Sequence, residues 1–129
     1  MIHFEIPGQP VPFARAGAQG KRRFTPKKQG DFMRAVRAIA AVAMRGAPPL
    51  GAPVSMTVEA AYLIPASWSK AKRRAALWKS SKPDASNVLK LLEDAMSGIV
   101  FVDDAQIAHL VVSKQYGPIS YVRVWVEAL

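Results

Sequence analysis

The sequence predicts one α+β domain over residues 1–129, with a mixed sheet of about four to five strands and two to three helices. Three observations support this fold class. The chain has 129 residues, half of them hydrophobic, which suits a single domain around one core. Apolar and polar residues alternate at both ends of the chain, as is typical of half-buried strands. Segments with helix-capping residues lie between them, and we find neither an internal repeat nor a second domain.

The chain begins with a predicted strand and a loop. Ile2, Phe4 and Ile6 alternate with polar residues before a Pro-Gly pair, so a strand is expected there. Residues 9–28 are rich in proline, glycine and basic residues, and they predict an extended loop.

The first helix is expected to end near Met44, but its start is open. Thr25 can cap a helix that has Pro26 at its first position, where proline is favoured. Gly30 weakens this beginning, so the regular part can instead start at Asp31.

The middle of the chain predicts a strand and a short basic helix. Residues 54–65 are expected to form the strand, and residues 66–82 contain the helix, with Ser67 or Ser69 as its cap. Pro83 then favours an extended approach to the next element.

A second amphipathic helix is expected to follow, capped by Asp84 or Ser86 and ending at Ser97 before Gly98. Residues 99–104 then predict a short apolar strand that ends in carboxylates. The last two strands are expected within residues 105–117 and 119–129. In the final strand, Val122, Val124 and Val126 face one way, and Tyr121, Arg123, Trp125 and Glu127 face the other.

Composition excludes several classes of protein. The chain has no cysteine, which excludes disulfides, thiolate metal sites and a cysteine nucleophile. The N-terminus has neither a charged lead nor an apolar core like that of a signal peptide, and no apolar run approaches the length of a membrane span. We therefore expect a cytoplasmic protein that does not associate with a membrane.

Charge is strongly segregated along the chain. The net charge is +9 and the pI is about 10.3, which predicts a polyanionic partner, with nucleic acid favoured over a merely solubilising surface or an anionic membrane. Arg15–Arg37 holds eight basic residues and one acid, and Lys70–Lys82 holds six basic residues and no acid. Five of the nine acids lie in Asp84–Asp104. This layout predicts a small acidic site that holds Mg²⁺ inside a surface that attracts phosphates.

The helix after Pro83 brings candidate side chains together. Helical spacing puts Asn87, Lys90 and Asp94 on one face, with Leu91 at its edge. Val88, Leu92 and Ala95 form an apolar face that can dock on the sheet.

Carboxylates flank this helix on both sides in the sequence. Asp84 precedes it, and the Asp103-Asp104 pair is expected to return towards its start. Two aspartates and a fixed lysine suit metal-assisted phosphodiester hydrolysis. Each piece also has a structural alternative: Asp84 as a cap, the Asp pair as a turn, Lys90 as a solvated lysine and Asp94 as its ion-pair partner.

The segment KPDASNVLKLLEDAMSGIVFVDDAQI resembles the signature of the RusA-type Holliday-junction resolvases, which read KPD-x-DN-x-x-K, then D-A-apolar-x-G, then V-x-DD-x-Q. The matching residues are Lys82, Pro83, Asp84, Asn87, Lys90, Asp94, Ala95, Gly98, Asp103, Asp104 and Gln106. The resemblance implies a RusA-like fold and a homodimeric, Mg²⁺-dependent endodeoxyribonuclease of DNA recombination and repair. It would nick two opposed strands of a four-way DNA junction and need no small-molecule cofactor beyond the metal.

The resemblance also implies roles for single residues. The family's first and third essential aspartates fall on Asp84 and Asp104, and its lysine falls on Lys90. The second aspartate falls on Ser86, which is a neutral and weaker ligand. The candidate metal ligands are therefore Asp84, Asp104, Asp103 and Ser86; the catalytic residues are Asp84, Asp104 and Lys90; the supporting residues are Asn87, Asp94 and Lys114.

Three outcomes of the serine remain open: compensation by Asp103 or Asp94, weaker metal binding in a working enzyme, or a protein that binds branched DNA without cutting it well. A nucleic-acid-binding module without activity and a basic structural protein are the rivals from other classes.

DNA contacts are expected from both basic segments. Phe24 can stack on or wedge against an opened base pair, or anchor its loop on the core. The dimer interface is expected in either residues 54–64 or residues 31–44. The residues expected to contact phosphates are Arg22, Arg23, Lys27, Lys28, Lys72, Arg73, Arg74 and Lys82.

Overall fold

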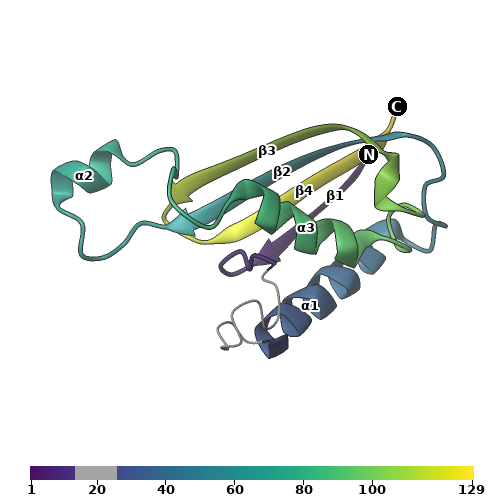
Figure 1. Cartoon of the computed structure of the whole chain (residues 1–129), viewed down its shortest axis with the longest axis horizontal. Coiled ribbons are helices and arrows are strands. Elements are labelled where there is room, and N and C mark those ends of the chain that lie inside the picture. The colour runs from purple at the N-terminus through teal and green to yellow at the C-terminus, as the bar shows by residue number, and fades with distance from the viewer. Residues whose placement is uncertain (14–25) are drawn as a thin grey trace, which may run out of the picture.

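Four strands form one mixed sheet in the order β1-β4-β2-β3 (Figure 1). The computed structural model describes residues 1–13 and 26–129. Adjacent strands are antiparallel except for β2 and β3, which run parallel. The bounds are β1 (Ile2–Pro7), β2 (Val54–Leu63), β3 (Ile107–Gly117) and β4 (Tyr121–Ala128). Within the described residues the prediction of an α+β domain with a mixed sheet is confirmed.

The described residues also form three α-helices: α1 (Pro26–Met44), α2 (Lys70–Ala75) and α3 (Ala85–Met96). The long helices α1 and α3 lie together on one face of the sheet, and α2 projects beyond the end of the sheet (Figure 1). Both α2 and α3 belong to the connection from β2 to β3, because parallel neighbours need a long crossover.

The core lies between this helix layer and one face of the sheet. Val122, Val124 and Val126 of β4 are completely buried, which confirms the predicted alternation. On α3, Val88 and Leu92 are completely buried against the sheet. Burying each such side chain contributes about 1.5–3 kcal/mol, so the apolar stripe fixes which face of α3 turns outwards.

One predicted side-chain cap, that of α2, is confirmed. The Ser69 hydroxyl accepts a hydrogen bond from the Lys72 backbone N–H, so Ser69 rather than Ser67 caps α2. Helix α1 begins at Pro26 and runs through Gly30, whereas its candidate cap Thr25 lies outside the described residues.

Residues 99–104 do not form the predicted strand. The Ile99 and Val100 backbone N–H groups both hydrogen-bond to the Met96 carbonyl, so the chain turns at the end of α3. Gly98 supports this turn with a φ of 85°, a conformation that favours glycine. The run is apolar because Val100 and Phe101 are completely buried, and a short buried turn has the same composition as a short buried strand.

The free edge of β3 is partly covered by the chain that follows α2. Trp78 pairs antiparallel with Gln115, and hydrogen bonds join Lys79 N–H to the Lys114 carbonyl (3.0 Å) and Tyr116 N–H to the Leu77 carbonyl (2.9 Å). No other described segment pairs with the outer edge of β3, and its residues 108–111 are exposed.

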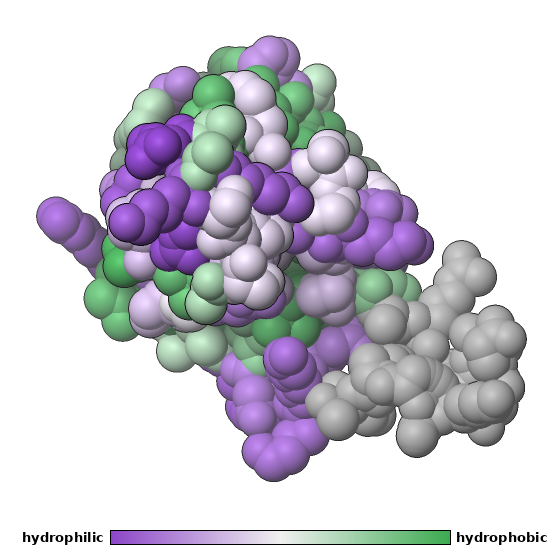
Figure 2. Space-filling model, turned by 90° about the vertical axis from the view of Figure 1, so that its left-hand side faces the viewer, coloured by the Kyte–Doolittle hydropathy of each residue, from purple (hydrophilic) through white to green (hydrophobic). Residues whose placement is uncertain are grey.

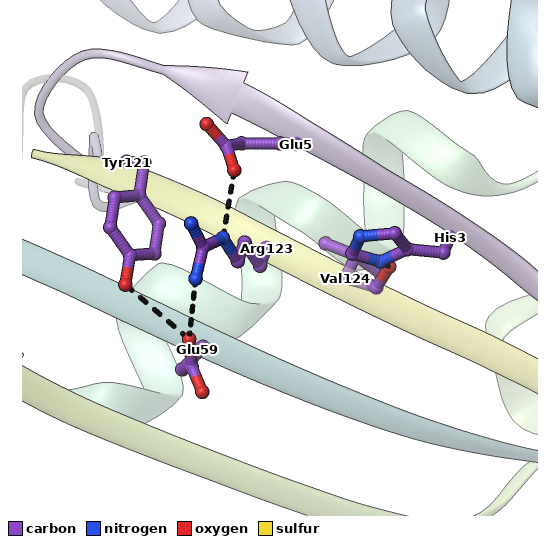
Figure 3. A network of polar contacts seen from close by, with 6 residues as sticks. All are labelled: His3, Glu5, Glu59, Tyr121, Arg123 and Val124. Atoms are coloured by element: carbon purple, nitrogen blue, oxygen red, sulfur yellow. Dashed lines mark hydrogen bonds and ion pairs between the residues drawn. The ribbon is translucent and has the colours of Figure 1, made fainter.

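The sheet face opposite the helices carries a polar network (Figure 3). The Arg123 guanidinium donates to Glu5 at 2.7 Å and lies 3.6 Å from Glu59. Beside them, His3 stacks on Trp125 with ring centroids 4.6 Å apart. Because two acids flank the single arginine, this face does not extend the basic surface. Among the described helices, none is both long enough and apolar enough to cross a membrane.

Candidate active site

Asp84 presents a carboxylate that the fold does not use. It occupies the cap position of α3, and its carbonyl accepts hydrogen bonds from the Asn87 and Val88 backbone N–H groups at 3.1 and 3.2 Å. Its side chain makes no capping hydrogen bond and is exposed. The structural alternative for Asp84, a side-chain cap, is therefore not realised, and the carboxylate is available to a ligand.

Lys114 holds the chain that leads to Asp84. From strand β3, its ammonium group donates hydrogen bonds to the carbonyls of Ser81 (2.8 Å) and Pro83 (2.7 Å). Bonds from a charged donor are stronger than neutral ones, so they fix the turn before α3 to the sheet. Lys114 thus positions Asp84 and has little freedom to contact a substrate.

Lys90 and Asp94 lie on the outward face of α3, as predicted from their spacing. Their charged atoms are 3.5 Å apart, and both side chains are partly exposed. An exposed pair of this kind is worth about 0.3–0.5 kcal/mol, so Lys90 can exchange Asp94 for a phosphate at little cost. Phe13 borders the same face, because its backbone N–H bonds to the Asn87 carbonyl at 2.9 Å.

Asp103 and Asp104 have different roles. The Asp103 carboxylate accepts a hydrogen bond from Ala105 N–H at 3.2 Å and caps a single 3₁₀ turn, η1 (Asp104–Gln106). Gln106 accepts from the Asp103 N–H at 2.8 Å and donates to the carbonyls of Leu50 and Ala52. These hydrogen bonds hold the turn without the Asp104 side chain, which forms no hydrogen bond or ion pair among the described residues.

Glu93 is a further candidate site residue, which the sequence did not indicate. Burial raises the pKa of its carboxyl group, and the negative charges of Asp104 and Asp94 raise this pKa further, against the opposing effect of Lys90. Glu93 therefore links the outward face of α3 to Asp104. In the sequence, only its position next to Asp94 could have indicated that Glu93 belongs with the candidate residues.

Asp84 and Asp104 lie at opposite ends of α3. Asp84 precedes its first turn, whereas Asp104 influences Glu93 near its last turn. At a rise of about 1.5 Å per residue, positions 84 and 93 are on the order of 13 Å apart along the axis. Mg²⁺ holds each oxygen at about 2.1 Å, so an ion bound by both carboxylates of one chain would have to bridge most of the length of α3.

This separation corrects the expected metal centre within one chain. The Asp103-Asp104 pair does not return to the start of α3, because residues 97–102 turn at the C-terminal end of the helix instead of forming a strand that runs back. No group of three or more Asp, Glu or His side chains among the described residues is arranged to hold a metal ion. The available donors are hard carboxylate oxygens, which suit Mg²⁺ in kind but are divided between two places.

A comparison of the whole chain with protein families gives its affiliation. The model of the family described as "Endodeoxyribonuclease RusA" matches residues 7–127. The chain belongs to the RusA endodeoxyribonuclease family. The uncharacterized protein YqaN of Bacillus subtilis (strain 168) is 28% identical over 135 residues, which cover 98% of this chain and 95% of that protein.

The residues of the RusA signature are divided along α3. Lys82 and Asp84 precede the helix, Lys90 lies in its middle, and Asp104 follows its C-terminal end. Ser86, at the position of the signature's second aspartate, is exposed in the first turn of α3. No hydrogen bond joins its hydroxyl to another described side chain.

Only some of the residues predicted to contact DNA lie within the part of this RusA-family chain that the structure describes. Arg22, Arg23 and Phe24 lie outside the described residues. Lys27 forms an ion pair with Asp31 at 2.9 Å, and Lys28 also has a partner. The other cations gather on α2 and the turn before α3. There, the Lys72 ammonium lies over the Trp68 ring, Arg73 donates to the Pro65 carbonyl, and Arg74 and Lys82 are exposed.

Proposed function

We propose that this protein is a Mg²⁺-dependent endodeoxyribonuclease that resolves four-way DNA junctions by paired nicks and acts as a homodimer in DNA recombination and repair. The observation that carries the proposal is the pair of unengaged carboxylates, Asp84 and Asp104, at positions where the RusA signature has aspartates. Neither has a structural role, although each occupies a place where a cap or a turn would account for it. Family membership supports the same conclusion.

Two copies are needed to unite these carboxylates. No other described segment pairs with the outer edge of β3 over residues 108–111, so this edge can pair with the same edge of a second copy. Antiparallel pairing about a twofold axis at position 109 or 110 would set residue 104 of one copy level with residue 114 or 116 of the other. Since Lys114 is bonded to Pro83, this arrangement would bring Asp104 of one copy close to Asp84 of the other.

Such pairing would form two equivalent metal sites per dimer. Each would draw on Asp84 and Ser86 from one copy and Asp104 from the other, with Glu93 beside Asp104. A bound Mg²⁺ supplies Lewis-acid polarisation of the phosphate and a more acidic water. Of the two dimer interfaces expected from the sequence, the one at β2 has no unpaired strand edge, because β2 pairs with β3 on one side and with β4 on the other. The outward face of α1, the other expected interface, is exposed.

The remaining residues would position the substrate. Lys90 would place a fixed positive charge beside the scissile phosphate, and Asn87, on the same outward face, would orient a ligand. Lys114 would hold the Asp84 turn in place. The cations of α2 and Lys82 would bind the phosphates on either side. Two sites related by symmetry address two opposed strands at once, which a four-way junction offers and a plain duplex does not.

A second candidate is a branched-DNA-binding protein with weak or absent cleavage. The observation that favours it is Ser86, which removes one negative charge and one strong ligand from the Asp84 end of the site. Incubation with a synthetic four-way junction, with and without Mg²⁺, separates the two functions. The nuclease predicts Mg²⁺-dependent nicking that Asp104→Asn abolishes while junction binding is retained. Tight junction binding with no nicking at any Mg²⁺ concentration would support the second candidate.

A further inference from the structure

The projecting end of the molecule combines aromatic and basic residues. We define the α2 lobe as residues 64–82, the part of the chain between β2 and Pro83. Viewed end-on, this side of the molecule interleaves hydrophilic and hydrophobic side chains (Figure 2). The lobe contains no acid and holds the six cations Lys70, Lys72, Arg73, Arg74, Lys79 and Lys82.

Trp78 is the unusual member of the lobe. Its side chain is 64% exposed, whereas a tryptophan is highly buried on average. It makes no ring contact and no cation–π contact among the described residues. Trp68 differs, because it packs edge-on against Tyr116 with centroids 5.0 Å apart and carries the Lys72 ammonium over its ring at 4.1 Å. Trp68 therefore has a structural role, and Trp78 has none.

The backbone around Trp78 is nevertheless fixed. Trp78 pairs antiparallel with Gln115, and the residues on either side of it are hydrogen-bonded to β3. The adjacent Lys79 has partners of its own, because its ammonium lies 4.9 Å from the Tyr62 ring centroid and 5.3 Å from that of Tyr116. Trp78 consequently presents an exposed indole on a segment that is held by hydrogen bonds on both flanks.

This position is connected to the candidate active site. Lys114 accepts the Lys79 hydrogen bond through its backbone and holds the Ser81 and Pro83 carbonyls through its side chain. One residue of β3 therefore locates both the Trp78 segment and the turn before Asp84. A strand whose phosphates follow the lobe towards Asp84 would pass Trp78 first.

We propose that Trp78 is a stacking site for an unpaired base of a DNA strand, whose phosphates bind the lysines and arginines of the α2 lobe. The α2 lobe would thus recognise the unpaired nucleotides beside a branch point, an inference that rests on the proposed nuclease function. Every base has an aromatic face, so an exposed indole binds it without sequence preference. An acidic protein or an anionic membrane would also match the positive charge of the lobe. Neither of them accounts for the hydrogen bonds by which Lys114 joins the Trp78 segment to the turn before Asp84.

Binding without Mg²⁺ tests the proposal on the full-length protein. The probes are a single-stranded oligonucleotide carrying 2-aminopurine and a hairpin-closed duplex with the same number of phosphates. Trp78→Ala is expected to weaken single-strand binding about five- to 150-fold, the range for loss of one stacked base. Binding to the closed duplex should change less than about twofold, and stacking should quench the probe in wild type but not in the variant.

Two matched variants serve as controls for Trp78→Ala. Trp78→Phe retains an aromatic face and should keep most of the affinity and the quenching. Leu77→Ala removes the adjacent exposed apolar side chain and should affect neither probe. Equal loss on both DNA probes in Trp78→Ala, or no loss on either, would overturn the proposal. The proposal would also be overturned if Trp78→Ala lost binding only to vesicles of phosphatidylserine and phosphatidylcholine, because that result would assign Trp78 to a membrane.

Junction nicking in the same preparations separates this inference from the proposed function. Wild-type nicking together with unchanged single-strand binding by Trp78→Ala would reject the stacking site alone. A selective loss of single-strand binding, with no nicking in wild type, would reject the nuclease and retain the stacking site.

Discussion

The Lys114 ammonium donates a hydrogen bond to the Pro83 carbonyl at 2.7 Å, and thereby joins strand β3 to the residue directly before Asp84. The same ammonium holds the Ser81 carbonyl at 2.8 Å. The turn that presents the first candidate metal ligand is thus fixed by a residue from the edge of the sheet. Over residues 108–111, no other described segment pairs with that edge, so it can pair with a second copy.

Lys114→Met is expected to loosen this turn. The variant leaves two carbonyls without their charged donor, which should cost about 1–3 kcal/mol of unfolding free energy. Denaturant unfolding measures the loss, and junction nicking should fall more than junction binding. Lys70→Met removes an equal charge from an exposed lysine and serves as the control. Equal unfolding free energies for both variants would show that the turn does not depend on Lys114.

Mixing two inactive variants tests whether the metal sites are shared between copies. Asp84→Asn and Asp104→Asn should each abolish nicking alone. In a mixed dimer with shared sites, one site carries both changes and the other carries neither, so one nick per junction should return. If each chain held its own complete site, the mixture would stay as inactive as its components. Single-strand nicks on a labelled junction provide the measurement.

Ser86→Asp is expected to increase Mg²⁺ affinity by restoring a negative oxygen ligand beside Asp84. Nicking should reach half its maximum at a lower Mg²⁺ concentration than in wild type. Ala85→Asp adds the same charge to the same helical turn, so it reproduces the general electrostatic effect without the ligand position. Identical Mg²⁺ dependence in these two variants would mean that position 86 is not a ligand.

The raised pKa of Glu93 makes a prediction about stability and pH. The folded chain holds this proton more tightly than the unfolded chain, so ionisation of Glu93 destabilises the fold. The cost is absent below the usual pKa of a glutamate and is complete above the raised pKa. Glu93→Gln should therefore raise the unfolding free energy at neutral pH relative to wild type, with little effect near pH 4.

The control for this pH effect is Glu127→Gln, which removes an exposed glutamate from the end of β4. Denaturant unfolding at several pH values gives the comparison. A difference between Glu93→Gln and wild type that does not change with pH would show that the folded-state pKa of Glu93 is not raised. Mg²⁺ should reduce the benefit of Glu93→Gln if Glu93 lies beside a bound ion.

Local patterns predicted most of the secondary structure correctly. The valines of β4 alternate because one sheet face is buried and the other is open, and this period is visible without knowledge of the neighbouring strands. Helix α3 could also be predicted from the sequence, because its apolar stripe and the glycine that follows it lie within one short segment. The strand expected at residues 99–104 failed because buried turns and buried strands share a composition.

The charge map, the RusA signature and the residues that can bind metal or phosphate were determined by the sequence alone, because they depend on residue identity and short spacing. Only the tertiary structure decided which of them meet. It set Asp84 and Asp104 at opposite ends of α3, placed Trp78 on the edge of β3, and made Lys114 the tie between that edge and the Asp84 turn. These relationships join residues far apart in the chain, and they arise from burial of one helix stripe and pairing of one strand edge, which no local pattern encodes.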